Sequence, residues 1–212
     1  MIALLVISGC KKADNNFHAR ISFLNGAIGA EPFTFKFNDD VAISKDSFGV
    51  LKSFTTVPSG TFKIGFFRGT TATADFSFTT NIESARDYTC FPFDSVGKYT
   101  VFFQKDVLPE TVTENKCALR FFSLIPKSTG LSLQNDTGKV FMSGKSFATF
   151  SNSFDEMDTT SRMIKLKMSG TVAALDSISK PLVAGKIYTL FLTGSIGGTG
   201  VQKPKLIFLE HN

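Results

Sequence analysis

The chain has 212 residues, of which 19% are charged and 42% hydrophobic, so its composition is globular and excludes an intrinsically disordered protein. It contains 24 Phe, 3 Tyr and no Trp, which is enough apolar material for a sizeable core. Only 2 His and 3 Cys are present, which argues against a zinc cluster, a multi-disulfide scaffold or an iron–sulfur site. The net charge of +5 comes from scattered Lys and Arg, so we expect no nucleic-acid partner.

Residues 1–9 predict the end of a secretory signal peptide. The apolar run from Ile2 to Ile7 is far too short to span a membrane as a helix. The string Ile7-Ser8-Gly9-Cys10 that completes it resembles a bacterial lipobox, in which the Cys takes a diacylglycerol and becomes the new N-terminus. No basic stretch follows Met1, so we expect a start further upstream or a truncated chain. The alternative is a chance Gly-Cys pair after a short apolar run.

Residues 10–16 predict a tether, because they are polar and have no apolar period. We therefore expect Cys10 to be the lipid attachment site and the membrane to be a partner through that lipid. Everything after Cys10 is then extracytoplasmic and anchored to the outer membrane, at either its periplasmic or its cell-surface face.

The rest of the chain repeats itself after about 100 residues. Four blocks recur in the same order, and in the first of them we align Arg20 with Arg120. The blocks are 19–24 with 118–124, 47–51 with 146–150, 87–89 with 187–189, and 99–104 with 206–210. This pattern predicts two units, residues 17–114 and 115–212, each the size of a small β-sandwich.

Within each unit the apolar residues recur with a period of two. Phe33-Thr34-Phe35-Lys36-Phe37 puts its rings on one face, and Ile164-Lys165-Leu166-Lys167-Met168 does the same in the second unit. Turn residues separate these runs, as at 135–138 and 197–200. No segment has a helical pattern of three turns, and residues 153–158 alone predict a single helical turn. The fold class is therefore all-β, with two antiparallel β-sandwiches in tandem.

The order of these elements resembles the domain-of-unknown-function family 4397, found in tandem on bacterial envelope lipoproteins. The resemblance covers nearly all of residues 17–212, and its best-matched pieces are 57–62 and 184–189. The second unit departs from the pattern at 158–162, where a Pro-Ser-Gly turn is replaced. The family implies an immunoglobulin-like or transthyretin-like sandwich outside the cytoplasm and no established activity.

The residues that could carry chemistry all have a plainer interpretation. His18 and His211 lie at opposite ends of the repeat region, so we expect two solvated histidines rather than parts of a triad. The Gly-rich segment 194–200 is followed by a strand rather than a helix, which favours a hairpin loop over a phosphate-binding loop. Asp155, Glu156 and Asp158 favour a solvated acidic loop over half a calcium site. We expect no catalytic residue, no metal and no cofactor.

Tyr88 and Tyr188 each open a late strand, as does the corner tyrosine of immunoglobulin-type sandwiches. The hydroxyl of such a tyrosine bonds back to nearby backbone. We therefore expect both residues to have a structural role rather than a binding role.

Adjacent Phe residues predict contact between the two units. In the pairs 66–67, 102–103 and 121–122, one ring of each must point away from the first face of its strand. We expect the neighbouring unit to cover these rings; the alternative is an exposed patch for a partner or glycan. The linker 107–114 is short and stiff, which also favours packing.

Cys90 and Cys117 remain once Cys10 is assigned to the lipid. In an oxidising envelope they could form a disulfide that bridges the end of the first unit to the start of the second, and the alternative is two buried free thiols.

These observations favour a non-catalytic envelope lipoprotein that acts as a binding or adhesion module or as structural support. The alternative is a carbohydrate-binding accessory protein at the cell surface, although the absence of Trp lowers that interpretation. We expect a monomer whose partner is an unknown protein or glycan.

Overall fold

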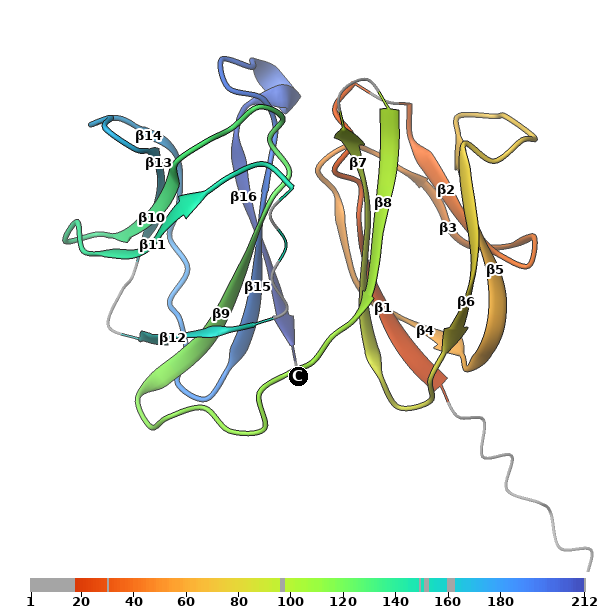
Figure 1. The fold of residues 1–212 in the computed structure, drawn as a ribbon, viewed down its shortest axis with the longest axis horizontal. Helices are drawn as coiled ribbons and strands as arrows, with labels where there is room; N and C mark the ends of the chain where they lie inside the picture. The colour runs from red at the N-terminus through yellow and green to blue at the C-terminus, as the bar shows by residue number, and fades with distance from the viewer. Residues whose placement is uncertain are drawn as a thin grey trace, which may run out of the picture.

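The protein is described here from a computed structural model that covers residues 18–29, 31–95, 98–148, 150, 153–159 and 163–211. Over these residues the chain forms sixteen β-strands and one 3-10 helix, arranged as two β-sandwiches side by side (Figure 1). The predicted all-β class with two tandem sandwiches is confirmed. Cys10 and the predicted signal and tether lie outside the described residues.

The first domain contains eight strands in two four-stranded sheets, ordered β4-β1-β7-β8 and β3-β2-β5-β6. All neighbouring strands are antiparallel except β1 and β7, which are parallel. The strands are β1 (His18–Leu24), β2 (Phe33–Phe37), β3 (Asp40–Asp46), β4 (Leu51–Pro58), β5 (Gly60–Arg68), β6 (Phe76–Ile82), β7 (Asp87–Ser95) and β8 (Lys98–Lys105).

The second domain has the same topology, with sheets ordered β12-β9-β15-β16 and β11-β10-β13-β14 and one parallel pair, β9 with β15. Its strands are β9 (Lys116–Ser123), β10 (Leu131–Asn135), β11 (Val140–Lys145), β12 (Asp155–Asp158), β13 (Ile164–Met168), β14 (Ala174–Ile178), β15 (Ile187–Thr193) and β16 (Lys205–His211). Each strand of the first domain therefore has a counterpart in the second.

Alternating side chains build a separate core in each sandwich. In β2, Phe33, Phe35 and Phe37 are buried, while the polar residues between them are half-buried. These rings pack with residues of the opposite sheet, such as Ile21 and Phe23, to form the core of the first domain. The second domain has an equivalent core around Leu131, Leu133 and Leu190 and the residues that pack with them.

The structure corrects one predicted element and confirms another. Residues Asp155–Asp158 form β12, which pairs antiparallel with β9, so the predicted helical turn at 153–158 is wrong. Pairing with a preformed strand overrides the weak local preference of a four-residue acidic segment. The Gly-rich segment 194–200 connects the antiparallel strands β15 and β16 as a hairpin, as predicted, and the 3-10 helix Gly200–Gln202 lies at its end.

Strand pairing also corrects the alignment of the two repeats. In the parallel pair β1–β7 the residue beside Thr89 is Ser22, and in β9–β15 the residue beside Thr189 is Arg120. The counterpart of Arg120 is therefore Ser22, and our alignment of Arg20 with Arg120 is wrong by two residues. A shift of two residues keeps every side chain on the same face of a strand, so the apolar pattern cannot detect it.

The sheets that contain β1 and β9 face each other across the domain interface (Figure 1). A third apolar cluster fills this interface with residues from both domains, and Phe91 lies at its centre. Its ring contacts the rings of five others: Phe93, Phe102, Phe122, Phe150 and Phe191.

In two of the three adjacent Phe pairs, one ring lies in a domain core and the other lies in the interface, as the sequence predicts. Phe102 and Phe122 lie in the interface, whereas their neighbours Phe103 and Phe121 lie in the two domain cores. In the third pair, Phe66 is buried in the first core and Phe67 lies half-buried on the outer face, where Lys36 Nζ is 4.4 Å from its ring centroid. The prediction that the neighbouring domain covers the second ring is therefore wrong for this pair.

The connector between β8 and β9 is attached to the second domain. Glu156 in β12 accepts hydrogen bonds from the backbone N–H of Thr113 (2.7 Å) and from its hydroxyl (2.8 Å). Two bonds from one residue to a carboxylate fix the end of the connector beside β12.

Candidate functional site

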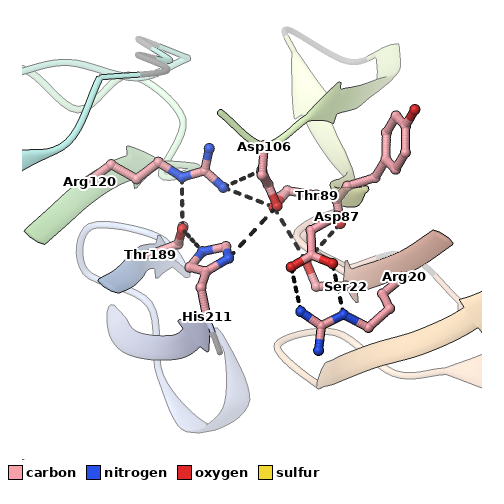
Figure 2. Close-up of polar contacts among 9 residues, drawn as sticks. Arg20, Ser22, Asp87, Thr89, Asp106, Arg120, Thr189 and His211 are labelled. Carbon is pink, nitrogen blue, oxygen red and sulfur yellow. Dashed lines mark hydrogen bonds and ion pairs between the residues drawn. The ribbon is translucent and has the colours of Figure 1, made fainter. Parts of the chain in front are cut away.

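A group of buried polar side chains occupies one end of the domain interface (Figure 2). We call Thr89, Asp106, Arg120, Thr189 and His211 the central polar cluster. The side chains of Asp106, Arg120 and His211 are completely inaccessible to solvent. Buried charges are rare and need partners, so this cluster is the most distinctive chemical feature of the described residues.

Arg120 holds the two halves of the cluster together. Its Nη2 donates to Asp106 Oδ1 (2.5 Å) and to Thr89 Oγ1 (3.0 Å) in the first domain, and its Nε donates to Thr189 Oγ1 (2.7 Å) in its own. The hydroxyl of Thr89 donates to the other carboxylate oxygen of Asp106 (2.9 Å). On the other side, Thr189 Oγ1 and His211 Nε2 are 2.7 Å apart. The ion pair and its hydrogen bonds therefore cross the interface.

The members of the cluster occupy equivalent positions in the two domains. Asp106 follows β8, and its backbone N–H donates to the carbonyl of Asp87 (2.9 Å). His211 ends β16 and pairs with Ile187. Asp87 and Ile187 each directly precede a corner tyrosine, so Asp106 and His211 are counterparts. The first domain thus contributes Thr89 and Asp106, and the second contributes their counterparts Thr189 and His211 together with Arg120.

Burial controls the protonation of these groups. Loss of solvation and, to a smaller extent, the positive charges of Arg120 and Arg20 together lower the pKa of His211 from 6.5 to about 3, so the ring is neutral at physiological pH. Loss of solvation also raises the pKa of Asp106 and lowers that of Arg120, while the charge of each partner opposes these shifts. The ring therefore contributes polarity without charge, and the ion pair carries the charge.

The order Thr189–His211–Asp106 resembles that of a catalytic triad, but its geometry does not suit nucleophilic catalysis. His211 Nδ1 lies 3.9 Å from Asp106 Oδ2, which is too long for a hydrogen bond. The histidine is a weak base because of its lowered pKa, and the whole group is sealed from solvent. The arrangement therefore forms part of the contact between the domains and does not present a nucleophile to a substrate.

Aromatic rings enclose the cluster on both sides. Phe54 in β4 and Phe154 just before β12 each lie edge-on to the His211 ring, with distances between ring centroids of 5.6 and 5.9 Å. Arg120 lies over Phe154, and Arg20 lies over Phe54, with guanidinium-to-centroid distances of 4.8 and 4.6 Å. Such contacts are stronger when desolvated, so the Phe154 ring helps to stabilise the buried charge of Arg120, whereas the side chain of Arg20 is 38% exposed.

A cleft of about 800 Å³ opens beside the cluster, between the first domain and the connector. Arg20 and Asp87 form a two-bond ion pair on its wall, at 2.8 and 2.7 Å. His18, Arg86 and Asp106 also line the cleft. Its size is within the range of small-ligand sites.

Several candidate residues from the sequence lie apart. His18 is exposed at the start of β1, as expected, but His211 is buried, so the prediction that it is solvated is wrong. Asp155, Glu156 and Asp158 are exposed, as predicted, but they belong to strand β12 rather than to a loop. Within the described ranges, no group of three His, Cys, Asp or Glu residues is arranged to hold a metal ion.

Cys90 and Cys117 are both free and buried, each in the core of its own domain. The disulfide that we considered between them is therefore not formed. Burial raises the pKa of Cys117 to about 11 and that of Cys90 well above its usual value, so both thiols are protonated and unreactive at neutral pH.

Sequence reasoning missed the central polar cluster, although one signal points to it. Arg120 interrupts the apolar run from Cys117 to Phe122 in strand β9, which is buried on both faces. A charged residue in such a strand requires a buried partner. The identity of that partner, Asp106, depends on how the domains pack, which a single sequence does not encode locally.

No protein-family profile matches the chain, and a search of curated proteins finds no match either. The resemblance to family 4397 therefore stays a prediction. Within the residues that the structure describes, no helix is long and apolar enough to cross a membrane.

Proposed function

We propose that this protein is a cell-envelope lipoprotein that is non-catalytic and that serves as a binding or adhesion module or as structural support. A lipid on Cys10 anchors it, and residues 11–16 connect that anchor to the first domain. The single observation that carries the proposal is the string Ile7-Ser8-Gly9-Cys10, which a polar segment and then a folded β-domain follow.

The way the two domains pack supports this role. A module that acts at a distance from its anchor benefits from a fixed spacing between its parts. Here a shared aromatic cluster and a buried ion pair join the domains, and Glu156 holds the connector. The pair thus extends from the tether as one body whose outer sheets, β3-β2-β5-β6 and β11-β10-β13-β14, face away from the interface.

Metabolic labelling with an alkynyl palmitate analogue tests the proposal, with the gene expressed from its native upstream region. We expect the wild-type protein to incorporate the label and Cys10→Ala to lose it completely. Cys90→Ala is the matched control, because it removes a cysteine that is buried in a domain core. Label that persists in Cys10→Ala would contradict the proposal.

A further inference from the structure

The domain interface is built from the same surface of each domain. Phe91 in β7 and Phe191 in β15 are counterparts, and their rings contact each other with centroids 5.6 Å apart. The counterparts Asp106 and His211 also meet, at 3.9 Å. Contacts between equivalent positions are the mark of an isologous interface, the kind that joins the subunits of a two-fold symmetric dimer.

Reciprocal contacts at the other end of the interface agree with this symmetry. Phe93 in β7 contacts Phe147, in the loop between β11 and β12. Thr193 is the counterpart of Phe93 in β15, and Gly49, in the equivalent loop of the first domain, lies beside it. In each domain the same strand position, Phe93 or Thr193, therefore contacts the equivalent loop of the other domain.

At three pairs of equivalent positions, however, the side chains differ and are complementary. Ser22 corresponds to Arg120 and Asp106 to His211, so one domain supplies the carboxylate and the other supplies the guanidinium. Gly26 is the third case. A Cβ on Gly26 would lie 2.6 Å from Leu124 Cδ1, so the glycine makes room for the leucine of the second domain.

These differences disfavour a complex of two first domains and a complex of two second domains. Two first-domain faces would bring two Asp106 carboxylates together, and the guanidinium of Arg20 on that face is already paired with Asp87. Two second-domain faces would bury two copies of Arg120 without a carboxylate, and Leu124 would have no glycine to pack against. Buried unpaired charge and steric overlap are the usual means by which interfaces reject wrong partners.

We infer that the interface sheet of the first domain is a specific docking surface for the interface sheet of the second domain, that it rejects its own kind, and that it holds without the connector. This inference does not depend on the proposed function. The partner that fits this surface is a domain that presents an arginine at the Arg120 position and a large aliphatic residue at the Leu124 position.

A chain with a protease site inserted between Pro109 and Glu110 tests the inference on the folded protein. After cleavage, native mass spectrometry and gel filtration at micromolar concentration should show one complex that contains one of each fragment. Separation of the fragments, or complexes of two identical fragments in the cleaved sample, would overturn the inference.

Two variants of the cleaved chain test the basis of the specificity. Asp106→Asn should raise the dissociation constant about 30-fold or more, because it leaves Arg120 buried without a negative partner. The matched control, Asp39→Asn, changes an exposed turn residue and should leave the constant unchanged.

The steric part of the specificity has its own variant, which keeps the inference testable if Asp106→Asn does not fold. Gly26→Ala should weaken the complex, and Leu124→Ala in the same chain should restore part of the loss. Equal affinity for wild type, Asp106→Asn and Gly26→Ala would overturn the inference.

Discussion

Single residues decide how the two domains recognise each other. Arg120 would be costly in an apolar strand, because a buried charge without a partner loses its hydration. It is tolerated because Asp106 and two threonine hydroxyls accept its hydrogen bonds. Within the described residues, Arg120 Nη1 and His211 Nδ1 are buried without a hydrogen-bond partner. The cluster therefore contributes more to the choice of partner than to net stability, since buried ion pairs often contribute little net stability.

His211 makes the stability of the protein depend on pH. Its pKa in the folded state, about 3, lies below the ordinary value of 6.5, so the unfolded chain binds a proton that the folded chain rejects. Stability is therefore complete above pH 6.5 and falls as the pH drops toward the folded-state value. Asp106 acts in the opposite direction, because burial raises its pKa.

We predict that His211→Gln removes much of this dependence. In urea unfolding, wild type should lose about 2 kcal/mol of stability between pH 7 and pH 5, because protonation of the unfolded state is favoured. The variant should lose much less, and His18→Gln, which changes an exposed histidine, should behave as wild type does. Equal slopes for wild type and His211→Gln would contradict the buried, neutral histidine.

The same tyrosine hydrogen bond recurs at one strand of each domain. The hydroxyl of Tyr88 accepts a hydrogen bond from the backbone N–H of Glu83 (2.8 Å), and that of Tyr188 accepts one from Val183 (3.2 Å). Both partners lie five residues upstream, so the predicted corner tyrosines are confirmed. Each bond ties the segment before β7 or β15 to the strand itself.

We predict that Tyr88→Phe lowers the free energy of unfolding by about 1 kcal/mol, because the Glu83 N–H loses its partner while the ring stays in place. Tyr188→Phe should cost less, since its hydrogen bond is longer. Urea unfolding at pH 7 measures both differences. Unchanged stability in both variants would show that water replaces the hydroxyl at no cost.

The elements were predictable where the sequence pattern is local. Phe33 to Phe37 and Ile164 to Met168 alternate in polarity and form β2 and β13. Residues 155–158 were not predictable, because a short acidic strand forms only where β9 is available to pair with it. The two-residue error in aligning Arg20 with Arg120 has a similar origin, since parallel pairing with β7 and β15 sets the register.

At the scale of the whole molecule, two domains with separate cores share a third cluster. The abundance of Phe reflects this arrangement, because rings such as Phe102 and Phe122 fill the interface after Phe103 and Phe121 have filled the cores. Aromatic pairs contribute about 0.5–1.5 kcal/mol each beyond the area that they bury. The domains should therefore unfold together rather than one after the other.

Differential scanning calorimetry of the intact chain tests this claim most directly. We predict one transition for the wild type, with a calorimetric enthalpy equal to the van't Hoff enthalpy. The reason is that unfolding of either domain exposes the apolar residues that the other domain contributes to the shared cluster. In Asp106→Asn the coupling should weaken, so that the transition broadens or divides into two. Two separate transitions in the wild-type protein, each with the enthalpy of a single domain, would contradict the account.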